Sequence, residues 1–169
     1  MKTHVSLLTL LMMIGSFSQI FGQTFEVPAN YAFKTKADYA KYEPEVIQAV
    51  KWLENTPLNQ EDDKRKQVYL FVFTYVQGSP TVSVEVQGYV ADFSKKNPEL
   101  LIAFLGGWTK YKLENPTVTD PLILNTEGIK TMLKIYKLGG AAKDKNLEKL
   151  AKLSSDQELQ DWVKSKIKV

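Results

Sequence analysis

The amino-acid sequence predicts an all-α fold, a single compact domain of about six or seven helices that follows a cleaved signal peptide. Apolar side chains recur at three- and four-residue spacing along most of the chain, as they do on the buried face of a helix. Helix-start signals occur at Thr35, Asn97 and Ser155, and the pair Gly139-Gly140 is a helix-stop signal. One segment, residues 67–86, also fits an α+β alternative in which it forms a hairpin.

The first 22 residues have the pattern of a secretory signal peptide. Lys2 supplies a positive charge, an apolar run extends from Val5 to Ile14, and several small residues follow up to Gly22. The run is shorter than the ~20 apolar residues that a membrane-spanning helix needs. We expect cleavage after Gly22, with Ser18 as the alternative. The product would be an exported, periplasmic or secreted protein with no membrane insertion after cleavage, and residues 23–169 would form one helical domain.

The first helix is predicted to begin at Thr35, because Thr35 and Asp38 have the spacing of a capping box. Before it, residues 24–32 are expected to form an extended arm that packs on the domain. Pro44 predicts a kink or a restart, since proline has no N–H and crowds the preceding turn. The helix is expected to close at Thr56, because the residue before a proline disfavours the helical conformation.

Residues 67–86 allow two interpretations. The valines of the second half alternate with polar residues, which favours a strand and therefore a hairpin. Three consecutive acidic residues precede the first half, and acids at this place complement the positive end of a helix dipole. We therefore predict a helix over residues 61–77. For the second half, a helix that starts at Ser79-Pro80 and an extended segment to about Glu85, followed by a helix over residues 86–95, both fit.

Further helices are predicted in the second half of the chain. Asn97-Pro98-Glu99 is a helix start, with Asn97 as the N-cap and proline at the first helical position. Ser155 and Glu158 have the spacing of a capping box. Apolar faces place the helices at about residues 99–111, 129–136, 147–151 and 155–167.

The scarcity of histidine and cysteine limits the chemistry. The chain has one histidine, His4, and no cysteine, so cleavage after Gly22 would leave neither. Ser-His-Asp and Cys-His catalysis would then lack an essential group, as would zinc, copper and haem sites built on imidazole or thiolate. We expect no cofactor, no metal site and no catalytic residue. Arg65 is the single arginine, which argues against a nucleic-acid partner.

Residues 104–115, FLGGWTKYKLEN, form the most distinctive local cluster. Two glycines inside a helix cost about 1 kcal/mol each relative to alanine, which predicts a compensating contact. Either the glycines let a second helix approach while Trp108 fills the core, or a ligand approaches the bare backbone. In the second case Trp108 and Tyr111 would stack on a sugar or aromatic group. Trp108, Lys110 and Tyr111 are therefore the candidate ligand-binding residues.

Three segments, WLENTP, GSPTVSVEV and LLIAFLGGWTKYKLEN, occur in this order and resemble a family of small secreted helical proteins from Gram-negative bacteria. The resemblance covers most of the chain after the signal segment, and it implies a helical fold and export. Because no activity is assigned to that family, the resemblance implies no catalytic residues.

The function that we expect from the sequence is that of a non-enzymatic binding or interaction module with an unknown protein partner or small ligand. The alternative is a hydrolase or lyase that acts on polysaccharide or cell wall through carboxylates, a chemistry that needs no histidine.

Overall fold

The computed structural model describes residues 24–153 and 155–167, so the predicted signal peptide, residues 1–22, lies outside the described residues. Within them the chain forms seven α-helices and no β-strand, which confirms the all-α prediction. None of these helices has both the length and the apolar character that a membrane crossing requires. The helices are α1 (Lys36–Leu53), α2 (Asp62–Gly78), α3 (Gly88–Ser94), α4 (Glu99–Glu114), α5 (Pro121–Leu138), α6 (Lys145–Leu150) and α7 (Asp156–Lys164).

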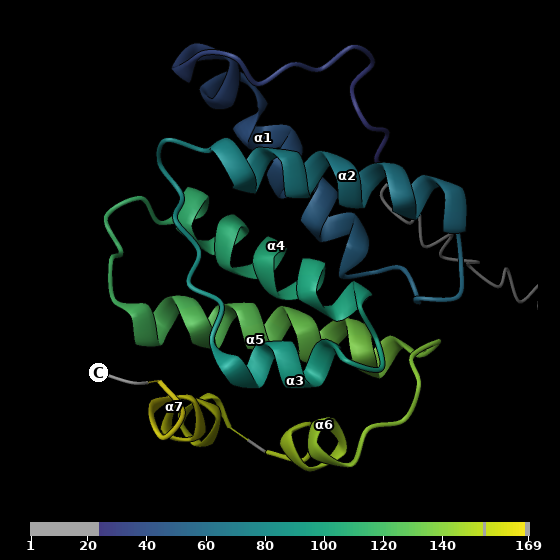
Figure 1. Ribbon diagram of the computed structural model, residues 1–169, viewed down its shortest axis with the longest axis vertical. Coiled ribbons are helices and arrows are strands. Elements are labelled where there is room, and N and C mark those ends of the chain that lie inside the picture. Colours follow the sequence, from purple (N-terminus) through teal and green to yellow (C-terminus); the bar gives the residue numbers. More distant parts are fainter. Residues whose placement is uncertain (1–23, 154, 168–169) are drawn as a thin grey trace, which may run out of the picture.

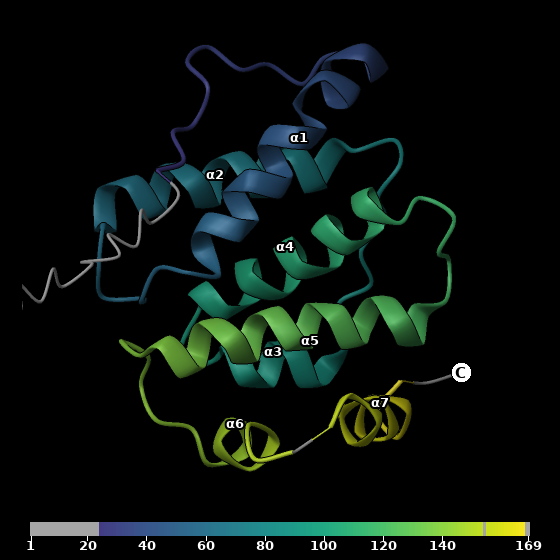
Figure 2. The ribbon, with the colours of Figure 1, turned by 180° about the vertical axis from the view of Figure 1, so that it is seen from behind.

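The helices are stacked from one end of the molecule to the other (Figure 1). α1 and α2 form one end, α4 and α5 cross the middle side by side, and α6 and α7 form the opposite end, as the reverse view also shows (Figure 2). α3 lies beside the central pair on the side of α6 and α7. The most extensive contact between any two helices is that of α4 with α5.

Glycines allow the central helices to approach closely. A Cβ atom on Gly107 of α4 would lie 2.5 Å from Thr131 of α5 and 2.8 Å from the carbonyl oxygen of Glu127. A Cβ on Gly106 would lie 3.0 Å from Val50 of α1. The space over the two glycines is therefore filled by the neighbouring helices, which confirms the interpretation of this pair as a site of close helix contact.

The hairpin alternative for residues 67–86 is wrong. The helix predicted there is confirmed as α2, and its apolar run forms a buried face with four fully buried side chains, those of Val68, Phe71, Val72 and Tyr75. The chain is then extended until α3 begins at Gly88, so the interpretation of an extended segment followed by a helix is confirmed. In this extended segment Val82 is buried and Val84 is half-buried, but Val86 is 48% exposed, so only the first part of the strand-like alternation faces the core.

Two local predictions are decided in part or overturned. α1 continues through Pro44 as one helix, which excludes a restart there, while a kink at Pro44 stays a prediction. Asn97 does not cap α4; its side-chain amide donates to the carbonyl of Ala142 at 2.9 Å, and its oxygen accepts from the Ala142 amide at 2.7 Å. The local pattern was that of a cap, but a segment 45 residues away supplies both partners.

The N-terminal arm packs on the domain as predicted. Phe25 is buried with its ring centroid 6.4 Å from that of Phe71, and Tyr31 makes an edge contact with the same ring at 4.8 Å.

The single arginine is also part of the fold. The buried Arg65 guanidinium donates to the carbonyls of Thr56 and Pro57 and so holds the loop between α1 and α2.

Candidate ligand-binding pocket

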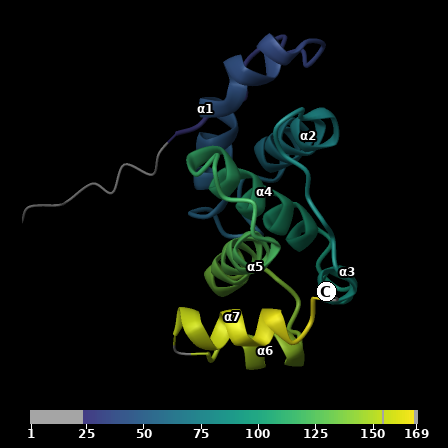
Figure 3. The ribbon, with the colours of Figure 1, turned by 90° about the vertical axis from the view of Figure 1, so that its left-hand side faces the viewer.

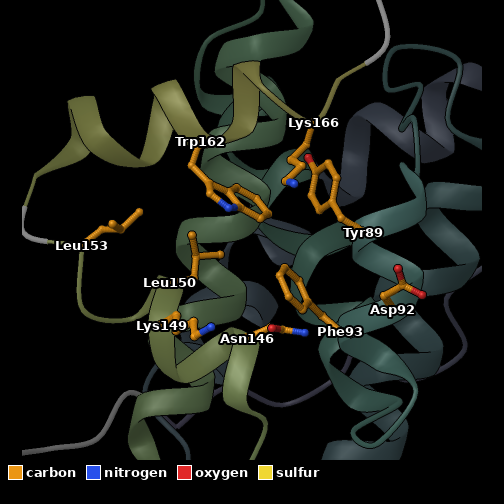
Figure 4. A pocket seen from close by; sticks show the side chains of 9 residues that line it. All are labelled: Tyr89, Asp92, Phe93, Asn146, Lys149, Leu150, Leu153, Trp162 and Lys166. Atoms are coloured by element: carbon orange, nitrogen blue, oxygen red, sulfur yellow. The ribbon is translucent and has the colours of Figure 1, made fainter.

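A pocket of about 470 Å³ lies where α3, α6 and α7 meet (Figure 4). Its apolar lining consists of aromatic rings from α3 and α7 together with leucines at and after the end of α6. Its polar lining consists of two lysines, an aspartate and an asparagine. The lining residues are Tyr89, Asp92, Phe93, Asn146, Lys149, Leu150, Leu153, Trp162 and Lys166.

α3 supplies Tyr89 and Phe93, which are four residues apart and therefore lie on the same side of the helix. The Tyr89 hydroxyl donates to Oδ1 of Asn125 in α5 at 2.8 Å, and the side chain of Asn125 is fully buried. Burial raises the pKa of the Tyr89 phenol well above its ordinary value. The phenol is thus a neutral, fixed part of the wall rather than an acid or a base.

α7 supplies Trp162. The helix begins with the predicted capping box, in which Ser155 accepts from the amide of Glu158 at 3.2 Å. Lys130 of α5 binds Asp156 at 2.5 Å, and Leu159 is buried against the domain. The C-terminal end of α7 approaches α3 (Figure 3), which brings Trp162 over the two aromatic residues of α3.

α6 closes the third side of the pocket. Its N-cap residue, Asp144, accepts from the amides of Asn146 and Leu147 at 2.8 and 3.1 Å. The hydroxyl of Tyr136 in α5 accepts from the Asp144 amide at 3.0 Å and donates to Glu148 at 3.0 Å. These bonds hold the short helix against α5.

The three aromatic rings are in mutual contact. The ring centroids of Trp162 and Tyr89 lie 5.2 Å apart with the planes at 79°, and those of Trp162 and Phe93 lie 5.9 Å apart with the planes at 22°. Figure 4 shows the indole of Trp162 pointing into the space between α7 and α3, with Leu150 and Phe93 below it. The result is an apolar surface that is bounded by rings on two sides and by Leu150 on a third.

The charged residues lie around this apolar surface. Asp92 forms an ion pair with Lys95 at 2.6 Å. The ammonium group of Lys166 lies 5.8 Å from the centre of the Trp162 ring. Lys149 and Lys166 are exposed, and no acidic side chain among residues 24–153 and 155–167 forms an ion pair with either.

The candidate residues from the sequence, Trp108, Lys110 and Tyr111, all lie on α4 but have different surroundings. Trp108 is 2% exposed, lies 6.0 Å from the ring of Phe104, and borders a smaller hollow of about 220 Å³. Tyr111 is half-buried and packs against the core. Lys110 forms an ion pair with Glu54. A ligand-binding role for these three residues stays a prediction.

Glu54 is the centre of a polar cluster that joins α1, α4 and α5. Its carboxylate accepts from Lys110, from the Thr131 hydroxyl at 2.9 Å and from Lys134 at 3.2 Å. Burial by itself would raise the pKa of this carboxyl, but the hydrogen bonds and positive charges bring the pKa below its ordinary value. Glu54 is therefore an ionised structural group.

The residues of the pocket were assigned to helices from the sequence but not to a site. Tyr89 and Phe93 lie in the helix predicted over residues 86–95 and Trp162 in the one over residues 155–167, and the apolar side chains of such helices ordinarily form the core. Lys149 directly precedes Leu150 and Lys166 follows Trp162 by four positions, but lysines are frequent in this chain, so this local signal was weak. Over the described part of the chain, no group of three or more acidic, histidine or cysteine side chains is placed to hold a metal ion.

Comparisons with protein-family models, with curated proteins and with solved structures found no match to this chain.

Proposed function

We propose that the protein is a non-enzymatic binding module that holds a small ligand with a flat apolar body between α3, α6 and α7. The observation that carries this proposal is a pocket of about 470 Å³ lined by three aromatic rings from two helices. Ligand pockets commonly enclose about 300–1,000 Å³ and combine apolar walls with a few polar groups. Aromatic rings provide a large contact area for a flat ligand.

The composition of the pocket distinguishes it from a larger hollow at the N-terminal end of α6. This hollow has a volume of about 630 Å³, but charged and polar side chains alone line it. Water solvates such a surface well, so a ligand gains little by displacing it. A ligand that covers the apolar surface beside Trp162 removes it from water, which favours binding by roughly 25 cal/mol per Å² of apolar area.

The ion pairs of Glu54 favour a binding function over a catalytic one. Glu54 is the one acidic residue of the described residues that is buried as a whole, although one oxygen of the half-buried Glu45 is also buried. The two oxygens of Glu54 are occupied by Lys110, Lys134 and Thr131. A general acid or base must reach a substrate proton, and this carboxylate is held by its partners.

We also propose that the protein is exported. The support is the charge, the apolar run and the small residues of positions 1–22.

A fluorescence titration tests the proposal. N-phenyl-1-naphthylamine is an uncharged aromatic probe whose emission rises in apolar surroundings, and we expect saturable binding to the folded protein. Asn146 lies exposed at the rim of the pocket, so Asn146→Trp is expected to fill the opening and to weaken binding about tenfold or more.

Lys164→Trp is the matched control, because Lys164 is exposed on α7 and does not line the pocket. It should leave the affinity unchanged. Absence of saturable binding to the wild-type protein, or equal affinity of all three proteins, would refute the proposed site. Far-ultraviolet circular dichroism and urea unfolding check that both variants keep the native fold and stability.

A further inference from the structure

We infer that the ligand of this pocket carries an anionic group, a carboxylate, sulfonate or phosphate attached to its flat apolar body, which Lys149 and Lys166 bind at the rim. The inference rests on the proposed function, since it concerns the same pocket. It goes further because it assigns the chemical class of the ligand and the residues that select it.

The first argument is the balance of charge around the apolar surface. Two lysines and one aspartate line the pocket. Lys95, which lies outside the lining, neutralises Asp92 at 2.6 Å. The positive charges of Lys149 and Lys166 therefore remain in excess, and they stand next to aromatic walls that exclude water on one side.

The second argument is that these lysines differ from three lysines of the central helices, Lys110, Lys130 and Lys134, which have ion-pair partners. Lys110 and Lys134 bind the carboxylate of Glu54, and Lys130 binds Glu127 and Asp156. The fold supplies no such partner to Lys149 or Lys166 from the described residues. An anion brought by a ligand would give them that partner without breaking an existing ion pair.

The third argument is the position of the two charges relative to the rings. The ammonium group of Lys166 lies 5.8 Å from the centre of the Trp162 ring, within the range of a cation–π contact, which restrains the lysine next to the pocket. Lys149 enters from α6 on the other side of the opening (Figure 4). A flat ligand lying between Trp162 and Leu150 would thus expose its edge to both ammonium groups, and Asn146 adds a neutral hydrogen-bonding side chain.

The test compares two probes with the same aromatic rings. 8-Anilino-1-naphthalenesulfonate is N-phenyl-1-naphthylamine with one added sulfonate, so any difference in affinity reports the anionic group. We expect the wild-type protein to bind the sulfonate probe more tightly than the neutral probe. We also expect added salt to weaken the binding of the sulfonate probe alone, because salt screens the attraction between exposed charges.

The double variant Lys149→Gln/Lys166→Gln is expected to bind the sulfonate probe about threefold to tenfold more weakly and the neutral probe unchanged. Lys34→Gln/Lys36→Gln removes the same charge from two exposed lysines that have no ion-pair partner among the described residues, and it should change neither affinity.

The outcomes separate this inference from the proposed function. The inference of an anionic ligand is contradicted if the wild-type protein binds both probes with the same affinity and the Lys149/Lys166 variant does so too. The pocket would then be a site for neutral ligands. An equal loss in the two double variants also contradicts it, because the effect would then be one of net charge. Failure of both probes to bind refutes the proposed function itself.

Discussion

At the scale of single residues, the tightest constraint in the central layer lies at Gly107. The hydrogen at its Cα faces Thr131 and the backbone oxygen of Glu127, and a methyl group there would lie 2.5 and 2.8 Å from them. Neither neighbour can move freely, because the Thr131 hydroxyl binds the buried Glu54 and Glu127 contributes main-chain atoms of α5. The bare backbone at this position is therefore required for the packing of α4 on α5.

Gly107→Ala is accordingly expected to destabilise the protein by about 1–3 kcal/mol, because the extra methyl overpacks the contact. Gly88→Ala is the matched control. Gly88 begins α3 with no atom within 4 Å of the added Cβ, so this change should be neutral or slightly stabilising. Urea unfolding followed by circular dichroism measures both, and equal stabilities of the two variants would contradict the close helix contact.

At the scale of elements, Glu54 links the end of α1 to both central helices. Its pKa is lowered in the folded protein relative to the ordinary value of 4.5, so the ionised carboxylate stabilises the fold at neutral pH. This contribution is present above about pH 4.5 and is lost as the pH falls through the lower pKa of the folded state. Acid should therefore loosen the contact of α1 with α4 and α5.

Glu54→Gln is expected to lower the free energy of unfolding at pH 7 by about 2 kcal/mol, because the hydrogen bonds from Lys110 and Lys134 lose their charged partner. The difference from the wild-type protein should shrink below about pH 4.5. Urea unfolding over a pH series measures it. Glu85→Gln, at an exposed residue of the extended segment, should show no such effect. A constant difference between wild type and Glu54→Gln at every pH would contradict the role assigned to the charge.

Elements were predictable where their signals are local. The capping boxes at Thr35 and Ser155 and the stop at Gly139 involve residues a few positions apart, and each bounds a helix in the structure. Asn97 shows the limit of such signals. Asparagine before proline is a good local helix cap, yet the side chain of Asn97 bonds to Ala142 instead. The packing of the chain decides between these two partners.

At the scale of the whole molecule, the pocket arises from the packing of helices that are distant in sequence. Tyr89 and Phe93 meet Trp162 only because α7, which follows α5 and α6 in the chain, lies against α3. Each of these side chains taken alone has the pattern of a core residue. The sequence therefore predicts the helices that carry these side chains. The pocket between the helices depends on the tertiary arrangement.

The signals of the three tryptophan side chains test the account most directly. Trp52, Trp108 and Trp162 each give one indole N–H resonance in a ¹H–¹⁵N correlation spectrum, and they lie on α1, α4 and α7. On titration with 8-anilino-1-naphthalenesulfonate, we expect the Trp162 resonance to shift and saturate while those of Trp52 and Trp108 stay in place. A shift confined to Trp108 would instead favour the site predicted on α4, and the absence of any saturable shift would contradict a ligand pocket between α3, α6 and α7.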